Sequence, residues 1–168
     1  MDYIDILNSI KNSEGGLVTV MLLDYDTCNY NFLKSLYQEL KKEYNIEYDN
    51  YNIKNINVKT VVFIDILKIP RVNNSIGNRS ILFRNLLGNE NVIIIAIKHV
   101  NSALTPSSLY GGEEIYTSNI VFSIKDKKLT VVKSRYTEFH HNNELLDISN
   151  ISALVRKMKL NKIIKNNI

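Results

Sequence analysis

Acidic side chains that follow apolar runs are the residues of this chain best suited to chemistry. In VVFIDIL (61–67), four apolar residues lead directly into Asp65. A carboxylate inside a buried strand is costly unless it is paired, so Asp65 either ends the strand or is held by a specific partner. In nucleotide hydrolases that partner is a Mg²⁺ ion on a nucleotide. Similar positions are occupied by Asp24 and Asp26 after LVTVMLL (17–23) and by His99 at the end of NVIIIAIKH (91–99).

Strands alternating with helices must position these groups. Continuous apolar runs predict buried strands, and apolar residues at helical spacing predict amphipathic helices. The predicted strands lie at 17–24, 58–67 and 91–99, and the predicted helices at 3–12, 31–44 and 76–88. Asn74 or Ser75 is placed to cap the last of these helices. Residues 45–58 are polar, which favours a loop with a short edge strand.

The C-terminal third predicts a different pattern. Strands at 119–124 and 128–135 are joined by a tight turn at 125–127, and a helix follows over 147–165, capped by Asp147 or Ser149. The whole order predicts an α/β fold, a mostly parallel sheet flanked by helices, with a C-terminal β-hairpin and helix. Ligands of such sheets bind beyond the carboxyl ends of the strands, so the acids and His99 are expected to converge there.

In order and spacing, these motifs resemble the RecA-like ATPase core of RecA and RadA recombinases, phage recombinases and ring helicases, over about residues 15–138. VVFIDIL resembles the Walker B strand, whose acid holds Mg²⁺ through water, which matches Asp65. NRSILFRNLLGNENVIIIAIKHVN (78–101) resembles the next helix and strand, which ends in a Gln or His that senses the γ-phosphate, and His99 holds that place.

Three further stretches carry the same resemblance. LVTVMLLDYDTC (17–28) resembles the strand of the catalytic base, with Asp26 in place of the usual Glu. SSLYGGEEIYTSNIVFSI (107–124) resembles the loop that leads into the next strand. LTVVKSRYTEF (129–139) resembles the K-x-R strand, which implies that Lys133 and Arg135 reach a nucleotide on a neighbouring subunit.

One motif of the family is absent. A RecA-type ATPase carries G-x-x-x-x-G-K-[ST], whose backbone N–H groups and Lys hold the phosphates, on an earlier strand. Only 16 residues precede the strand at 17, and they contain no such motif. The resemblance therefore implies relics of a catalytic site at Asp26, Asp65 and His99, and no cofactor. ATP, with Mg²⁺ held by Asp65, is expected only where a partner supplies the phosphate loop in trans.

The C-terminal helix is basic. Its cations are Arg156, Lys157, Lys159, Lys162 and Lys165, and no acid follows Asp147. Such a helix either lies on the sheet with its cations in water or contacts phosphates. The net charge of +4 permits contact with nucleic acid without requiring it.

Simpler interpretations stay open for each site residue. Asp65 can end a strand and cap the next turn, His99 can be an ordinary strand-end histidine, and Asp24 and Asp26 can be solvated turn acids. Lys133 and Arg135, which alternate on one strand face, can face water. The pair His140-His141 lacks a third metal ligand of suitable spacing, and nothing positions Cys28 and His99 as a thiol enzyme.

Length and composition limit the functional classes. The 168 residues, 45% of them apolar, predict one domain spanning 1–168, and no apolar run reaches the ~20 residues that cross a bilayer. The single cysteine excludes an internal disulfide. We expect an intracellular protein, in the nucleus or in the cytoplasm of a prokaryote or phage-infected cell, with no membrane partner.

Three functional hypotheses follow from the resemblance. The first is a non-catalytic RecA-like subunit, similar to a recombinase paralogue, that pairs with an ATPase of the same fold or with itself and assists DNA recombination or repair. It would contact single- or double-stranded DNA through the loop at 99–116 and the basic helix. The second is part of an ATPase that takes its phosphate loop from another chain. The third is a scaffold that binds no DNA, like the RecA-fold subunits of the Elongator complex.

Overall fold

The chain folds around a twisted, mostly parallel β-sheet. The computed structural model describes residues 1–51, 55–68, 87–100, 115, 117–134 and 145–166. These residues form seven strands in the order β2-β3-β4-β1-β5-β6-β7. The strands are β1 (Leu17–Leu22), β2 (Asn45–Tyr48), β3 (Thr60–Asp65), β4 (Val92–His99), β5 (Ile120–Lys125), β6 (Lys128–Ser134) and β7 (Leu146–Asp147). Strands β1 to β5 run parallel, β6 pairs antiparallel with β5, and β7 pairs antiparallel with β6, which confirms the predicted α/β class.

Strand β1 is central, with β4 on one side and β5 on the other. After β1 the chain continues to β2, which lies at one edge of the sheet. After β4 it continues to β5, which lies on the other side of β1. Neighbouring strands whose connections run in opposite directions open a crevice at their carboxyl ends, where ligands of open α/β sheets bind. The topology therefore favours a site above β1 and β4.

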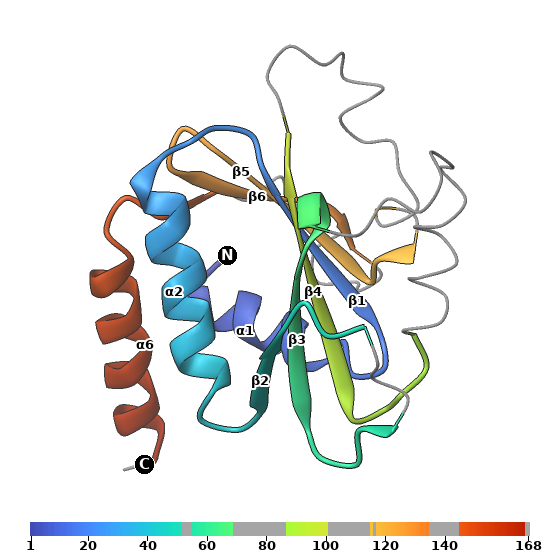
Figure 1. Ribbon diagram of the computed structural model, residues 1–168. Coiled ribbons are helices and arrows are strands. Elements are labelled where there is room, and N and C mark those ends of the chain that lie inside the picture. Colours follow the sequence, from blue (N-terminus) through green and yellow to red (C-terminus); the bar gives the residue numbers. More distant parts are fainter. Residues whose placement is uncertain (52–54, 69–86, 101–114, 116, 135–144, 167–168) are drawn as a thin grey trace.

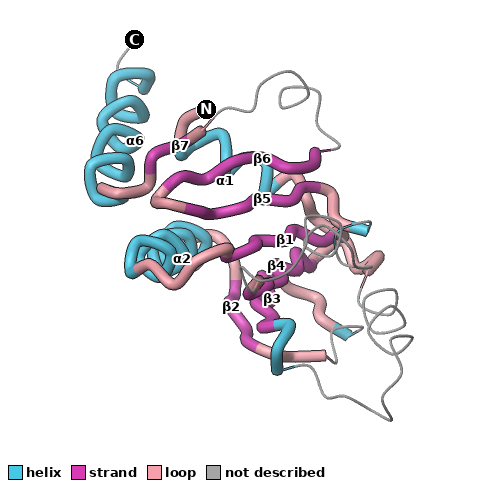
Figure 2. Tube along the Cα trace, turned by 90° about the horizontal axis from the view of Figure 1, so that it is seen from above, coloured by secondary structure: helices cyan, strands magenta, loops and turns pink. Residues whose placement is uncertain are grey.

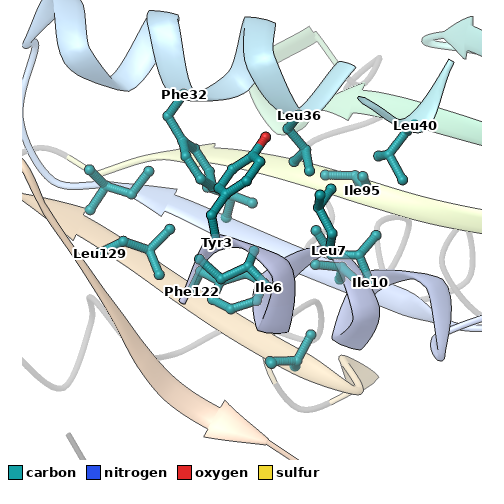
Figure 3. Packing of buried hydrophobic residues seen from close by; sticks show 14 of the residues in the cluster. Tyr3, Ile6, Leu7, Ile10, Phe32, Leu36, Leu40, Ile95, Phe122 and Leu129 are labelled. Atoms are coloured by element: carbon teal, nitrogen blue, oxygen red, sulfur yellow. The ribbon is translucent and has the colours of Figure 1, made fainter. Parts of the chain in front are cut away.

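The three α-helices among the described residues pack on one face of the sheet (Figure 1). They are α1 (Tyr3–Lys11), α2 (Thr27–Leu40) and the C-terminal α6 (Ile151–Asn166), and a short 3₁₀ turn, η2 (Ile66–Lys68), follows β3. Side chains of α1 and α2 meet over the strands (Figure 3). Tyr3 and Phe32, both almost fully buried, meet edge to face with ring centroids 6.2 Å apart.

The second face of the sheet is buried as well. Val62, Ile64, Ile94 and Ala96 are each at most 1% exposed and form a separate apolar cluster. Successive residues of a strand point to opposite faces, so burial of both faces explains the unbroken apolar runs in the sequence. Of the helix expected over 76–88, residues 76–86 lie outside the described residues, and residues 87–88 form a turn.

The helix boundaries differ from the sequence-based prediction because of their caps. Helix α2 begins at Thr27 instead of 31, because the Asp26 carboxylate accepts the backbone N–H of Cys28 at 2.8 Å, and it ends at Leu40 instead of 44. Helix α6 begins at Ile151, where Asn150 Oδ1 accepts the N–H of Ala153 at 3.1 Å. The predicted caps Asp147 and Ser149 were wrong, since Asp147 instead accepts the N–H of Ser149.

The C-terminal hairpin is confirmed, and its turn is tight. Asp126 and Lys127 both have positive φ, 50° and 61°, as a two-residue type I′ turn requires. The short strand β7 was not predicted, because two residues carry no alternating pattern. It pairs Asp147 with Lys128 and Leu146 with Leu129, and so leads the chain from the hairpin to α6.

Candidate functional site

A cavity of about 780 Å³ lies beyond the carboxyl ends of β1 to β4 and along α2. The loop after β1 and the first three turns of α2 form one wall, and the ends of β2, β3 and β4 form the other. Figure 2 looks down on the molecule and shows α2 beside the sheet, next to β1 and β2. The cavity thus occupies the crevice that the topology favours.

The structure brings the acids and the histidine of the sequence prediction together. Asp24, Asp26, Asp65 and His99 all line this cavity, although they lie on three different strand ends. Their expected convergence at the carboxyl edge is therefore confirmed. The catalytic roles implied by the family resemblance stay predictions, and the local hydrogen bonds bear on each of them.

Asp65 is the last residue of β3 and is bound to backbone. Its Oδ1 accepts the N–H of Leu67 at 3.0 Å, and its own N–H donates to Asp49 Oδ1 at 3.0 Å. Asp49 in turn lies 3.6 Å from Lys68 Nζ. These bonds agree with the simpler interpretation, in which Asp65 ends the strand and caps the turn that follows.

The loop between β1 and α2 is acidic and internally bonded. Asp24 accepts hydrogen bonds from Asn29 Nδ2 at 2.7 Å and from the backbone N–H of Asp126 at 2.6 Å. Asp26 caps α2, and the Cys28 N–H that it accepts lowers the pKa of its carboxyl. The hydrogen bond to Asp26 raises the pKa of the Cys28 thiol, which disfavours the thiolate that a nucleophile needs.

This loop does not fit a Mg²⁺-nucleotide. A phosphate loop stands between a strand and a helix and offers glycine N–H groups and a Lys to the phosphates. Between Leu22 and Thr27 the chain has neither glycine nor lysine, and Asp26 occupies the N-terminus of α2. Within the described residues, no three His, Cys, Asp or Glu side chains are grouped to hold a metal ion. The Mg²⁺ role implied for Asp65, which requires a phosphate loop from another chain, stays a prediction.

His99 ends β4 and is half-buried. Its ring lies parallel to the ring of Tyr25, with an interplanar angle of 15° and centroids 6.4 Å apart. Tyr25 itself is 91% exposed, so this pair stands at the mouth of the cavity.

Aromatic rings dominate the rest of the wall, and the sequence analysis did not identify them. The aromatic residues that line the cavity are Tyr25, Tyr30, Tyr37, Tyr48 and Phe63. Tyr48 connects two of them, with its centroid 6.1 Å from Tyr37 and 5.7 Å from Phe63. The seven-residue spacing of Tyr30 and Tyr37 was a usable signal, because it places both rings on one side of α2.

The two cations that the resemblance places at a subunit interface lie largely outside the described residues. Lys133 lies in β6 opposite Val121, and its side chain is outside the described part of the molecule, as is the whole of Arg135. The pair His140-His141 also lies outside it.

The basic helix α6 is exposed along much of its length. Arg156, Lys159 and Lys162 are exposed, and Lys157 Nζ lies 3.2 Å from the Asp2 carboxylate at the start of α1. The side chain of Lys165 is not among those described. Ile163 is 57% exposed, together with Leu160 at 59% and Ile164 at 57%. None of the described helices combines the length and apolar character needed to cross a membrane.

Comparisons with known proteins add little to this geometry. No family model matches the chain, and no curated protein matches it. It is similar to a solved structure from Pyrococcus horikoshii OT3, described as a structural study of Project ID PH0250. The two are 13% identical with a TM-score of 0.41, over 87% of this chain and 86% of the other. A likeness at this level carries no argument about function.

Proposed function

We propose that this chain is a non-catalytic RecA-like subunit, which assembles with an ATPase or recombinase partner and assists DNA recombination or repair. The resemblance to the RecA-like family rests on the order of motifs in the sequence. The observation that carries the non-catalytic role is the acidic loop between β1 and α2. It stands at the centre of the parallel sheet, where a strand, a loop and a helix meet.

The charge of this loop opposes nucleotide binding. A helix N-terminus attracts phosphate through its free N–H groups and its dipole. In α2 the N–H of Cys28 is already bound by Asp26, and Asp24 adds a second negative charge nearby. A triphosphate would meet two carboxylates in place of a lysine, so its binding is electrostatically unfavourable.

Contact with DNA is proposed for α6. Arg156, Lys159 and Lys162 are exposed, and the sequence from 148 to 168 contains no acid. Exposed cations on one helix can neutralise phosphates along a nucleic-acid backbone and release counterions.

Isothermal titration of the whole chain with Mg²⁺-ATP tests the non-catalytic role. We expect no saturable heat at any concentration that titrates an ordinary P-loop protein. Tight binding of ATP would contradict the proposal directly, because it would require a phosphate site that the acidic loop cannot supply.

A gel shift with single-stranded DNA tests the second half of the proposal. We expect a shift that weakens with salt, and we expect the double variant Arg156→Gln/Lys159→Gln to bind less tightly. For single strands, the slope of log affinity against log salt becomes shallower by about 0.7 for each phosphate that the protein no longer neutralises. The matched control is Lys41→Gln/Lys42→Gln, at the end of α2, which removes the same charge from exposed positions.

A DNA-independent scaffold is the second candidate, and one observation favours it. Leu160, Ile163 and Ile164 are each more than half exposed on α6, which suits contact with protein. If the chain gives no shift with DNA at low salt, the scaffold is favoured. In that case Leu160→Ser/Ile163→Ser is expected to reduce self-association measured by light scattering, whereas Lys41→Gln/Lys42→Gln is not.

A further inference from the structure

The cavity beside α2 is acidic, although the protein as a whole is basic. Asp24, Asp26 and Asp65 line it, and Lys34 is the one lysine or arginine on its described wall. The chain carries a net charge of +4. A site that opposes the overall charge of its protein selects ligands of the opposite sign to itself, which here are cations.

The tyrosine rings that line the cavity also favour cations. Cations are attracted to the faces of tyrosine rings within about 6 Å of the centroid. Tyr30 and Tyr48 are 68% and 62% exposed, so their rings are open to a ligand. The Tyr37 ring already holds one cation, with Lys41 Nζ 5.7 Å from its centroid, which illustrates the interaction within this protein.

A buried amide on the wall holds one of the carboxylates in place. Asn29 lines the cavity and is 3% exposed. Its Nδ2 donates to the backbone oxygen of Asp24 at 3.0 Å and to Asp24 Oδ1 at 2.7 Å, which fixes the orientation of the amide. Its Oδ1 is buried and has no hydrogen-bond partner among the described residues. That oxygen is closed to solvent, so the role of the amide in this cavity is to hold the Asp24 carboxylate at the wall.

We propose that this cavity binds an organic cation, in which an alkylammonium or guanidinium group is carried on an apolar body. The carboxylates would attract the positive charge and accept N–H groups where the cation has them, and the tyrosine rings would cover the apolar part. The volume of about 780 Å³ is that of a site for a small molecule or an extended side chain. This site does not depend on the proposed function, because it requires neither DNA nor an ATPase partner.

Titration with small probes of different charge tests the site. The chain has no Trp and ten Tyr, and four of these line the cavity, so tyrosine emission reports binding directly. The probes are choline, its neutral isostere 3,3-dimethylbutan-1-ol, arginine amide and inorganic phosphate. We expect both cations to bind, choline at least roughly tenfold more tightly than the isostere. Equal binding of the isostere, tighter binding of phosphate, or no saturation by either cation at about 10 mM would overturn the proposal.

Matched variants locate the binding. Tyr30→Leu and Asp65→Asn are each expected to weaken cation binding roughly three- to tenfold, and Tyr30→Phe is expected to retain it because the ring remains. Tyr30 is exposed, and asparagine keeps an oxygen that can cap the turn at Leu67, so both variants are expected to fold. Glu90→Gln, an exposed change just before β4 at the opposite end of the sheet, is the control. Equal loss of binding in the control, or none in Tyr30→Leu and Asp65→Asn, would place the cation elsewhere and overturn the assignment.

Two sources can supply this chemistry, a free small molecule or a basic side chain of a partner protein. A short glycine-rich peptide with one arginine is compared with arginine amide. Tighter binding of the peptide assigns the site to a partner's side chain, and equal binding assigns it to a free ligand. Both results support the site. Cation binding without any DNA shift would leave the site standing and contradict the proposed DNA contact.

Discussion

Helices α2 and α6 lie side by side on the same face of the sheet, yet they are held very differently (Figure 1). Phe32, Leu36 and Leu40 of α2 are fully buried. Among the described side chains of α6, only Met158 is buried, whereas Leu160 and its neighbours point to water. The number of apolar residues in a helix therefore does not show how much of that helix is buried. The second half of α6 extends past the core, which leaves its cations and apolar side chains available to a partner.

The largest expected effect is on α2. Phe32→Ala removes a fully buried ring that packs against Tyr3, and such changes cost about 3–5 kcal/mol of unfolding free energy. Urea unfolding followed by circular dichroism measures this cost. A loss below about 1 kcal/mol would show that α2 is no better anchored than the exposed part of α6.

Met158→Ala is expected to have the next largest effect, about 2 kcal/mol, because Met158 is 6% exposed and belongs to the same core cluster as Phe32. The same unfolding experiment measures it. If this variant were as stable as the wild type, the N-terminal half of α6 would also have to be counted as peripheral.

Asn150→Ala removes the N-cap of α6, and the expected cost is about 1 kcal/mol. Asn150→Asp serves as the control, since aspartate is an equally good cap. A loss of stability in Asn150→Asp as large as in Asn150→Ala would contradict capping as the cause.

The caps of the two helices are expected to respond differently to pH. The Cys28 N–H lowers the pKa of Asp26, so its stabilising effect is present above the pKa of an unfolded aspartate, about 3.9, and is lost as the pH falls through the lowered folded value. The stability difference between the wild type and Asp26→Asn should therefore change between pH 7 and pH 3. Asparagine does not ionise, so the cap of α6 gives the stability difference between the wild type and Asn150→Ala no such dependence on pH. Equal differences at both pH values for Asp26→Asn would refute this assignment.

The smallest effect is expected for Leu160→Ala on the exposed side of α6. The side chain is 59% exposed, and surface changes of this kind stay within about 0.5 kcal/mol. Thermal unfolding of the isolated protein measures it. A large loss would mean that Leu160 is covered in solution, for example by a second copy of the chain.

Much of the fold was predictable because its signals are local. The apolar runs that became β1, β3 and β4 are long and uninterrupted, and the hairpin turn at Asp126 and Lys127 separates two clear strands. Boundaries were less predictable, because a cap depends on one hydrogen bond. Asp26 and Asn150 were both visible in the sequence, but Asp147 and Ser149 were equally suitable candidates by type.

The candidate site was predictable only in part. The convergence of Asp65 and His99 follows from the rule that parallel strands end at one edge, and that rule needs no tertiary detail. Two of the four tyrosines come from α2 and one from β2, and the sequence does not specify how closely these two elements approach. Their spacing is also compatible with an ordinary helix surface, so their shared cavity was not anticipated.

The sequence by itself determined the α/β class, the acids at the strand ends and the lack of a phosphate-loop motif in these 168 residues, because periodicity and residue type carry these features. Only the tertiary structure decided that Asp24 and Asp26 bind backbone and a neighbouring amide, that tyrosines from α2 and β2 line the same cavity, and that Leu160, Ile163 and Ile164 of α6 are exposed. These features depend on how elements distant in the sequence pack together, since burial, charge and hydrogen bonding at each residue are set by neighbours that local sequence does not identify.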